Sequence, residues 1–382
     1  KKNGRKHMVV VVPPGEVVYQ THEAENIVSW LNEEKIIVKA QVHAGGRGKS
    51  GGVKLCKNNE EVVQTVDKMI GMKIVTPQTS EEGKTVRRVY LEKGYEIEKE
   101  LYFCITVDRE TGGNTIITSK KGGVNIEEIA EKNPEEIHKL KISPGGDLLT
   151  HHARTIAYNL GLTGVAAKKA QKNILGIYKA FTSLDAALIE VNPFAVVKGG
   201  DVVVLDCKAS FDDNALYRQR QVAEMKDENE YDPLELEAAR HDLNYVKLEG
   251  NIGLMVNGAG LSMSTMDIIK YYGGEAANFM DVAGAATPTR VAAAFKLIYK
   301  DPDVKGILIN IFGGMMRCND IAQGLVDASK EVGLDKPLVV RLEGTNVEMG
   351  MDILKNSGFP IKPAETMEQA AQDIVNLVKE KK

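Results

Sequence analysis

The second half of the chain repeats one simple pattern, and no other feature of the sequence constrains the fold as much. Four short apolar runs end in small or glycine-rich turns, and each is followed by a helix-like stretch; the runs span residues 252–260, 276–284, 305–314 and 337–344. Strands that alternate with helices form a parallel sheet whose faces the helices cover. The pattern therefore predicts a doubly wound α/β sheet, in which ligands bind at the carboxyl ends of the strands.

The first half has a different, mixed pattern. A strand-like segment at 35–42 leads through a glycine cluster to an amphipathic, helix-like stretch at 60–71. Two further regions are typical of antiparallel hairpins, because pairs of strand-like runs flank short glycine-containing turns; the pairs are 100–108 with 114–119 and 187–197 with 201–210. We therefore expect a mixed α+β fold in this half.

Length and composition bound the organisation of the chain. A chain of 382 residues exceeds what a single hydrophobic core usually supports, so two or three domains are expected. A charged, Glu-rich stretch at 218–245 separates the two patterns and is predicted to be a connecting helical region. The main domain boundary is accordingly placed near residue 240.

Charge and cysteine content exclude several classes of protein. The net charge of −4, from 49 basic and 53 acidic residues spread along the chain, gives no basic face for nucleic acid or an anionic membrane. No apolar run approaches the roughly 20 residues that a membrane span needs. The four cysteines lack the spacing of a metal site and the density of a disulfide scaffold. We expect a soluble protein from a reducing compartment that holds any anionic ligand through local groups.

A glycine-rich loop at 43–52 is the first candidate for phosphate binding. It packs five glycines and two cations, Arg47 and Lys49, into ten residues directly after a strand. Glycines let backbone N–H groups approach a phosphate closely, although the spacing matches neither a Walker loop nor a dinucleotide fingerprint. A phosphate-binding loop and a mobile surface turn both fit. Lys39 on the preceding strand either faces inward toward nucleotide phosphates or lies on an edge strand in solvent.

Two strands of the second predicted hairpin carry oxygen ligands. Glu190 and Asn192 lie two apart and so point to the same face of their strand, and Asp206 lies within the apolar run of the partner strand. Carboxylate and amide oxygens that converge from two strands suit a magnesium ion that keeps waters and binds substrate phosphates. A buried polar network or a strand-end turn fits the same residues.

Two other carboxylates, Glu92 and Glu100, interrupt strand-like segments of the first half. Isolated carboxylates on strands usually face solvent. In a nucleotide site they would accept hydrogen bonds from the adenine amino group or the ribose hydroxyls. Nothing in the local sequence of Glu92 and Glu100 decides between a solvent-facing position and a nucleotide contact.

Two turns of the second half, Asn257–Gly260 and Gly313–Arg317, each follow a strand and precede a helix. Such turns leave free N–H groups and the positive end of a helix dipole facing an anion. Ordinary strand-to-helix turns also favour glycine. The presence of two such turns in one predicted sheet favours an anion-binding function.

Long motifs of both halves resemble one family. In chain order they read IVKAQVHAGGRGKSGGVKL, LEKG, KELY, ALIEVNPF, NALYRQ, LNYVKLEGNIGLMVNGAGLSMSTMDIIK, NIFGGMMRC and VVRLEGTN. Together they resemble the β subunit of succinyl-CoA synthetase from about Pro13 to the end of the chain. The resemblance implies an ATP-grasp nucleotide-binding domain of two subdomains at 1–238 and a flavodoxin-like CoA-ligase domain at 239–382.

The resemblance also implies roles for individual residues. By position, the nucleotide contacts are Lys39, Gly46, Arg47, Gly48, Glu92, Tyr95 and Glu100. The implied magnesium ligands are Asn192 and Asp206, and the implied contacts to the carboxylate substrate are Asn257, Gly314, Met315 and Met316. Glu190 matches the glutamate that steadies a phosphohistidine.

The implied reaction joins succinate to coenzyme A with ATP or GTP, releasing ADP or GDP and phosphate, as a step of the tricarboxylic acid cycle. Phosphate passes through a histidine of an α subunit, which also binds most of the coenzyme A, in an αβ or α2β2 assembly that contacts neither nucleic acid nor membrane. The seven histidines of this chain are His7, His22, His43, His138, His151, His152 and His241, and none lies in a glycine turn of the second half. The chain is therefore expected to be inactive alone, and to work in the bacterial cytoplasm or the mitochondrial matrix.

Several positions depart from the family pattern. The family's S-x-E-G-G reads SKKGG at 119–123, its V-G-G-G-A reads VAGAA at 282–286, and its G-G-I-V-R reads GGMMR at 313–317. The chain opens with KKNGRKHM in place of a segment like MNIHEYQAK, which truncation, processing or divergence would each explain. The bulkier methionines keep the backbone donors but reshape the acid pocket. A ligase for malate or another dicarboxylate, and a non-catalytic nucleotide-binding regulatory protein, are the alternatives.

Overall fold

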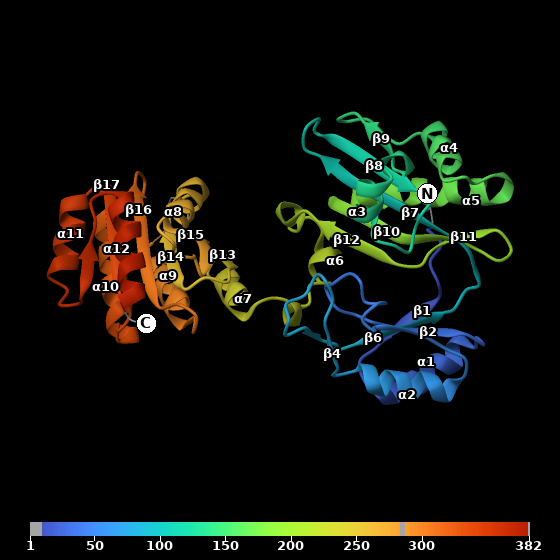
Figure 1. Cartoon of the computed structure of the whole chain (residues 1–382), viewed down its shortest axis with the longest axis horizontal. Coiled ribbons are helices and arrows are strands. Elements are labelled where there is room, and N and C mark those ends of the chain that lie inside the picture. The colour runs from blue at the N-terminus through green and yellow to red at the C-terminus, as the bar shows by residue number, and fades with distance from the viewer. Residues whose placement is uncertain (1–9, 283–286, 381–382) are drawn as a thin grey trace, which may run out of the picture. The chain divides into compact units, whose positions relative to one another are not determined.

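The computed structural model describes residues 10–282 and 287–380, and the chain forms two compact units, Lys1–Lys226 and Asp227–Lys382 (Figure 1). Helix α7 (Pro233–Arg240) packs against β13 (Asn244–Lys247) and α9 (Pro288–Lys300) of the second unit. The domain limit at 238/239, as implied by the resemblance, stays a prediction. Within the described ranges, no helix is both long enough and apolar enough to cross a bilayer.

The first unit begins with a four-stranded antiparallel sheet in the order β1-β6-β2-β3. Its strands are β1 (Gly15–Val18), β6 (Val89–Lys93), β2 (Ile36–Ala40) and β3 (Val53–Cys56), and its helices are α1 (Ala24–Leu31) and α2 (Asn59–Met69). Helix α1 buries Ala24, Val28 and Leu31, which share one face of a helix. The Asn58 side chain caps α2 by accepting the Glu61 N–H at 2.8 Å. A short ribbon of β4 (Lys73–Ile74) and β5 (Lys84–Thr85) completes this part.

The second sheet of the unit has the order β11-β10-β7-β8-β9, with β12 also paired to β10. Its strands are β7 (Ile97–Asp108), β8 (Gly113–Ser119), β9 (His138–Ile142), β10 (Ala186–Val197), β11 (Asp201–Val204) and β12 (Cys207–Phe211). Helices α4 (Thr150–Asn159) and α5 (Gly164–Ser183) share one hydrophobic core with it, whereas α3 (Ile126–Lys132) buries no residue. Both predicted hairpins are confirmed, because β7 pairs with β8 and β10 pairs with β11, both antiparallel.

One detail of the second hairpin differs from the prediction. Asp206 does not lie inside a continuous strand, because β11 ends at Val204 and β12 begins at Cys207. Opposite this break, the register of β10 against β7 shifts between Val191 and Phe194, and Pro193 there has no N–H to donate to a ladder. Asp206 therefore lies in the break between β11 and β12, and not within a strand.

The second unit contains a six-stranded sheet in the order β13-β15-β14-β16-β17-β18. Its further strands are β14 (Ile252–Val256), β15 (Asn278–Asp281), β16 (Gly306–Gly313), β17 (Leu338–Gly344) and β18 (Ile361–Pro363). These five are parallel and, numbered from β14, lie in the order 2-1-3-4-5 of a flavodoxin-like sheet, whereas β13 is an antiparallel edge. The predicted doubly wound fold is confirmed.

Helices cover both faces of this sheet and form separate cores. Helices α8 (Ala259–Tyr271) and α12 (Met367–Glu380) contribute to one core, and α9, α10 (Cys318–Val332) and α11 (Val347–Lys355) to the other. Each of the four predicted strand–helix repeats is present. Strands β13 and β18 were not predicted.

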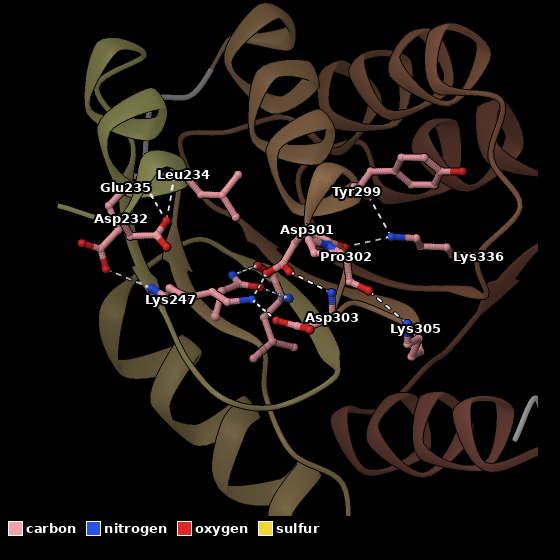
Figure 2. Close-up of polar contacts among 12 residues, drawn as sticks. Asp232, Leu234, Glu235, Lys247, Tyr299, Asp301, Pro302, Asp303, Lys305 and Lys336 are labelled. Atoms are coloured by element: carbon pink, nitrogen blue, oxygen red, sulfur yellow. Dashed lines mark hydrogen bonds and ion pairs between the residues drawn. The ribbon is translucent and has the colours of Figure 1, made fainter. Parts of the chain in front are cut away.

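A charged cluster fastens the unpredicted edge strand to its neighbours (Figure 2). The Lys247 Nζ on β13 lies 2.5 Å from Oδ2 of Asp301, whose side chain is fully buried, and 2.9 Å from Oδ2 of Asp303. The Lys247 N–H donates to Oε1 of Glu235 on α7 at 3.1 Å. This cluster therefore ties β13 to α7 and to the end of α9, where Asp301 lies.

Replacing Asp301 by Ala tests this attachment. Because the substitution removes the buried partner of Lys247, we expect the local opening free energy of β13 and the end of α9 to fall by about 2–3 kcal/mol. Arg240→Ala is the matched control, since its ion pair with Glu228 is exposed and contributes no more than about 0.5 kcal/mol. Hydrogen exchange of peptides from these elements measures both, and equal losses in the two variants would contradict the account.

Candidate functional site

One face of the second sheet, which we call the site face, is turned away from α4 and α5. Leu101, Phe103 and Ile105 of β7 lie in the core beneath those helices, and neighbours along a strand point to opposite sides. Glu100, Tyr102 and Cys104 therefore lie on the site face. Ile189 and Val191 of β10 lie in the same core, so Glu190 is on the site face as well.

Lys39 reaches this face from the first sheet. Its strand β2 lies between β6 and β3, so the alternative of an edge-strand lysine in solvent is wrong. The Lys39 Nζ is 2.5 Å from Oε1 of Glu92 on β6 and donates to the carbonyl of Leu205 at 2.7 Å. Glu92 is only 4% exposed; burial raises its pKa, and Lys39 opposes that rise. The expectation that isolated strand carboxylates face solvent therefore fails for Glu92, and Lys39 joins the two sheets.

Arg47 comes from the glycine-rich loop between β2 and β3, residues 41–52, which we call the flap. One of its terminal nitrogens, Nη2, donates to both carboxylate oxygens of Asp206, at 2.8 and 2.9 Å, and Nη1 donates to the Ala40 carbonyl at 2.8 Å. A guanidinium held by a carboxylate in this way is a strong, charge-assisted contact. The structure thus pairs a predicted nucleotide contact with a predicted metal ligand.

Hydrogen bonds from backbone N–H groups hold the flap in place near both of its ends. The Gly52 N–H donates to the Arg47 carbonyl at 2.8 Å, and the Gly45 N–H donates to Oε1 of Gln78 at 2.8 Å. Gly46 has a φ of +75°, a conformation that favours glycine. Gly46 and Gly48, both predicted nucleotide contacts, therefore flank Arg47 in a loop whose two ends are anchored.

Asn192 and Asp206 lie on adjacent segments, because the Asn192 N–H donates to the Asp206 carbonyl at 3.2 Å. The Asn192 Oδ1 accepts the Gly123 N–H at 2.7 Å, and its Nδ2 donates to the Val124 carbonyl at 3.0 Å. An amide and a carboxylate that adjacent segments carry fit magnesium by donor type. The described residues contain no group of three or more His, Cys, Asp or Glu that could hold a metal, so a magnesium ion here would take its other ligands from water and phosphate oxygens.

The turn at Gly122–Gly123 approaches β7 closely. The Gly122 N–H donates to the Glu100 carbonyl at 3.0 Å, and a Cβ at Gly122 would lie 2.3 Å from the Leu101 carbonyl oxygen. Gly123 has a φ of +69°, and a Cβ there would lie 2.2 Å from Oε2 of Glu100. Glu100, which is exposed, therefore lies directly against this turn. Lys121, the base that departs from the family pattern, instead pairs with Glu136 at 3.4 Å.

An apolar cluster lies beside these polar groups. Ala195, Val197 and Val203 are buried, and Tyr95 and Leu205 pack against them. The Lys93 ammonium lies 5.5 Å from the centre of the Tyr95 ring. Aliphatic and aromatic side chains of this kind suit a nucleobase through apolar contact. Tyr95, a predicted nucleotide contact, thus lies where a base could be held.

Glu190 has neighbours that the sequence interpretation did not single out. Across the sheet it pairs with Cys104 on β7. Tyr102 is nearly buried, and its pKa is raised by burial and by the adjacent Cys104 and Glu190. Burial also raises the pKa of Cys104 to about 11. Both groups therefore stay protonated at neutral pH, and alternation along 100–108 in register with 187–197 is the signal that could have identified them.

The predicted acid contacts lie at the carboxyl ends of β14 and β16, where the strand order of the second sheet reverses. The Asn257 side chain donates to the Phe312 carbonyl at 2.7 Å and accepts the Phe312 N–H at 2.8 Å. Gly258, with a φ of +98°, donates its N–H to Oδ1 of Asp281 at 2.6 Å and precedes α8. Asn257 therefore holds the two strand ends together at the point where such sheets bind ligands.

The two methionines in the turn after β16 differ in solvent exposure. Met315 is 83% exposed, whereas Met316 is buried in the core of the unit and can offer a ligand only its backbone. Gly314 lies between Met315 and the end of β16. The variant motif at 282–286 falls at positions 283–286 outside the described residues.

Comparison with known proteins defines the class of protein. The family model for the ATP-grasp domain matches residues 2–196, and the model for the CoA-ligase matches residues 255–375. An ATP citrate lyase from Methanothrix soehngenii, solved in complex with citrate and coenzyme A, shares the fold with a TM-score of 0.74 and 23% identity, covering 96% of this chain and 92% of that one. The chain thus carries the two domain types of a nucleotide-dependent acid–CoA ligase.

Curated relatives narrow the class to one family. Proteins named ADP-forming succinate–CoA ligase subunit beta, from Paramagnetospirillum magneticum, Bacillus licheniformis and Staphylococcus aureus, are each 50% identical to the chain over 380, 370 and 375 residues. The alignments cover 97%, 97% and 98% of the chain and 96%, 96% and 97% of the relatives. The chain belongs to the family of succinate–CoA ligase β subunits, and the resemblance seen in its motifs is confirmed.

The turn against β7 yields a test with a matched control. Gly123→Ala introduces both an unfavourable φ and a collision with Glu100, so we expect nucleotide affinity to fall about tenfold or more, or about 1.4 kcal/mol. Gly145 has a φ of +70°, but among the described residues no neighbouring atom lies within 4 Å of a Cβ placed there. Gly145→Ala should therefore lose stability without losing affinity. Calorimetric titration with nucleotide and magnesium measures both, and equal affinities would contradict the placement of Glu100.

Proposed function

We propose that this chain supplies the nucleotide-binding and acid-binding groups of a succinate–CoA ligase, which converts a nucleoside triphosphate, succinate and coenzyme A to a nucleoside diphosphate, phosphate and succinyl-CoA in the tricarboxylic acid cycle. The observation that carries the proposal is the convergence of Lys39, Arg47, Asn192 and Asp206 with Glu190 around the site face. Fold maintenance alone does not require this combination of cations and oxygen ligands.

Lys39 and Arg47 would bind the phosphates of the nucleotide. In the structure both cations are held by carboxylates, Glu92 and Asp206, which act as internal counter-charges. An incoming triphosphate replaces Asp206 as the partner of Arg47 and releases that carboxylate. Glu100 and Tyr95 would contact the sugar and base.

Asn192 and Asp206 would hold magnesium together with phosphate oxygens and water. When bound, the ion supplies charge neutralisation for the transferring phosphoryl group. Asp206 and Arg47 exchange partners as the nucleotide enters, which keeps both charges compensated.

Asn257 and the turn Gly314–Met316 would hold the carboxylate substrate in the second unit. The N-terminus of α8 starts directly after Gly258 and favours a bound anion electrostatically. The acid would be met by backbone N–H groups of the turn, with the exposed Met315 side chain beside it.

The phosphorylated histidine would come from an α subunit, which would also bind most of the coenzyme A, in an αβ or α2β2 assembly. None of the described histidines of this chain lies in the turns that follow β14 and β16. Glu190 would hold the ring of the partner's histidine through the nitrogen that does not carry phosphate. We propose ATP as the nucleotide because the curated relatives are named as ADP-forming. The site of action would be the cytoplasm in a bacterium or the mitochondrial matrix in a eukaryote.

Reconstitution with an α subunit tests the proposal. We expect succinyl-CoA only when both subunits, magnesium and nucleotide are present, with ATP and GTP assayed in parallel. Asp206→Ala should lower turnover about 100-fold, or about 3 kcal/mol, and remove magnesium-dependent nucleotide binding. Asp201→Ala is the control, since that exposed carboxylate of the same hairpin pairs only with Lys169 in the described part of the chain. No product with a verified α subunit would overturn the proposal, and nucleotide binding that ignores Asp206 would favour a regulatory protein.

A comparison of dicarboxylic acids tests which acid the ligase prefers as its substrate. Because the Met315 side chain offers a malate hydroxyl no hydrogen-bond partner, and the loss of that hydroxyl's water costs about 1–3 kcal/mol, we expect kcat/KM for succinate to exceed that for malate about tenfold. Rates with succinate, malate and glutarate at saturating nucleotide and coenzyme A measure this preference. A higher kcat/KM for malate would assign the chain to a ligase for a hydroxylated acid.

A further inference from the structure

Lys208 lies directly opposite Glu190 in the sheet. The residues pair across β12 and β10, and residues that pair directly on adjacent strands point to the same face. Cys104 pairs with Glu190 from the other side, on β7. Lys208, Glu190 and Cys104 therefore form one row across the site face, with Glu190 in the middle.

Lys208 differs from the other cations near this face. Lys39 is engaged by Glu92 and the Leu205 carbonyl, and Arg47 is engaged by Asp206 and the Ala40 carbonyl. Lys208 is exposed, and within the described ranges its ammonium has neither a hydrogen bond nor an ion pair. Its charge is therefore available to an anion that arrives from outside the chain.

We propose that Lys208 is a further catalytic residue, whose ammonium contacts the phosphoryl group while it is transferred to the histidine of the α subunit beside Glu190. This inference rests on the proposed function. A carboxylate that holds the histidine ring also repels a phosphoryl group carrying about two negative charges. A cation directly across the strand pair from that carboxylate offsets the repulsion.

The step balances without a further reactant. The neutral ring nitrogen of the partner's histidine attacks the γ-phosphorus, the N–P bond forms, and the bond from the γ-phosphorus to the bridging oxygen breaks. The electron pair of that bond leaves with the nucleoside diphosphate. Glu190 accepts a hydrogen bond from the N–H of the other ring nitrogen, and the Lys208 ammonium stabilises the charge on the equatorial oxygens.

Reach and chemistry both suit Lys208 to this role. Adjacent strands lie about 4.8 Å apart, so the backbones of the two residues are close. A lysine carries a compact charge on a flexible stem and can follow a phosphoryl group that moves between nucleotide and histidine. Lys39, in contrast, is held by Glu92 within the first sheet, and Arg47 lies in the flap and pairs with Asp206.

The same row of the sheet offers a matched control. Cys104 pairs with Ile117 on β8, and Ile117 pairs with Lys139 on β9, so Lys139 lies on the same face three strands from Glu190. At about 4.8 Å per strand this places its backbone roughly 14 Å away. Lys139 is also exposed and also lacks a hydrogen bond or ion pair within the described residues.

The experiment measures single-turnover phosphorylation of the α-subunit histidine with γ-labelled nucleotide in the assembled complex. We expect Lys208→Gln to slow phosphorylation about 100-fold, in the range seen when one positioned donor is removed. Nucleotide affinity and subunit affinity should change less than about threefold. This is well below a tenfold change in affinity, which corresponds to about 1.4 kcal/mol. Lys208→Arg should recover part of the rate, and Lys139→Gln should match the wild type.

A rate for Lys208→Gln within twofold of the wild type would overturn the inference. A slow rate explained entirely by lost nucleotide or subunit affinity would also overturn it. Failure of the wild-type complex to phosphorylate any histidine would instead reject the proposed function, so the two failures are distinguishable.

Discussion

The ion pair between Lys39 and Glu92 is the interaction on which the rest of the nucleotide-binding unit depends. Both side chains are nearly buried, and removing one partner of such a pair typically costs about 3–5 kcal/mol because the other charge is left unpaired. The Lys39 ammonium also bonds to the Leu205 carbonyl, next to Asp206. The pair therefore sets where the second sheet meets the first, and with it the position at which the flap can reach Asp206.

The pairing of Arg47 with Asp206 matters for the proposed chemistry because it compensates the charge of both groups. Arg47 and Asp206 satisfy each other's charge, and under the proposed function each is a group that a magnesium-bound nucleotide would take up. In the proposed function, the exchange would keep the nearly buried Arg47 guanidinium paired before and after binding, which limits the cost of burying its charge. Tyr102 and Cys104, protonated because of burial, add neutral groups beside Glu190 and no further negative charge.

Much of the fold and of the candidate site could be predicted from the sequence. The features that the sequence interpretation missed have physical reasons. The strand–helix rhythm after residue 250 predicted the second sheet because periodicity is local. The pairing of Arg47 with Asp206 joins residues 159 apart, and no local pattern records it. Tyr102 and Cys104 were missed because residues 101–105 form one continuous buried run, whose composition alone does not separate the two faces of the strand, and the break at Asp206 coincides with a register shift in β10 that no local pattern records. Long motifs, by contrast, identified the family.

Hydrogen exchange of the flap in the complex with an α subunit tests the central claim most directly. If phosphates take Arg47 from Asp206, amides of the flap (residues 41–52) and of the Gly122–Gly123 turn should exchange at least about tenfold more slowly with nucleotide and magnesium than with nucleotide and a chelator, a change of about 1.4 kcal/mol. This protection should disappear in Asp206→Ala. Bound nucleotide with unchanged exchange in both segments, or equal protection in Asp206→Ala, would contradict the account.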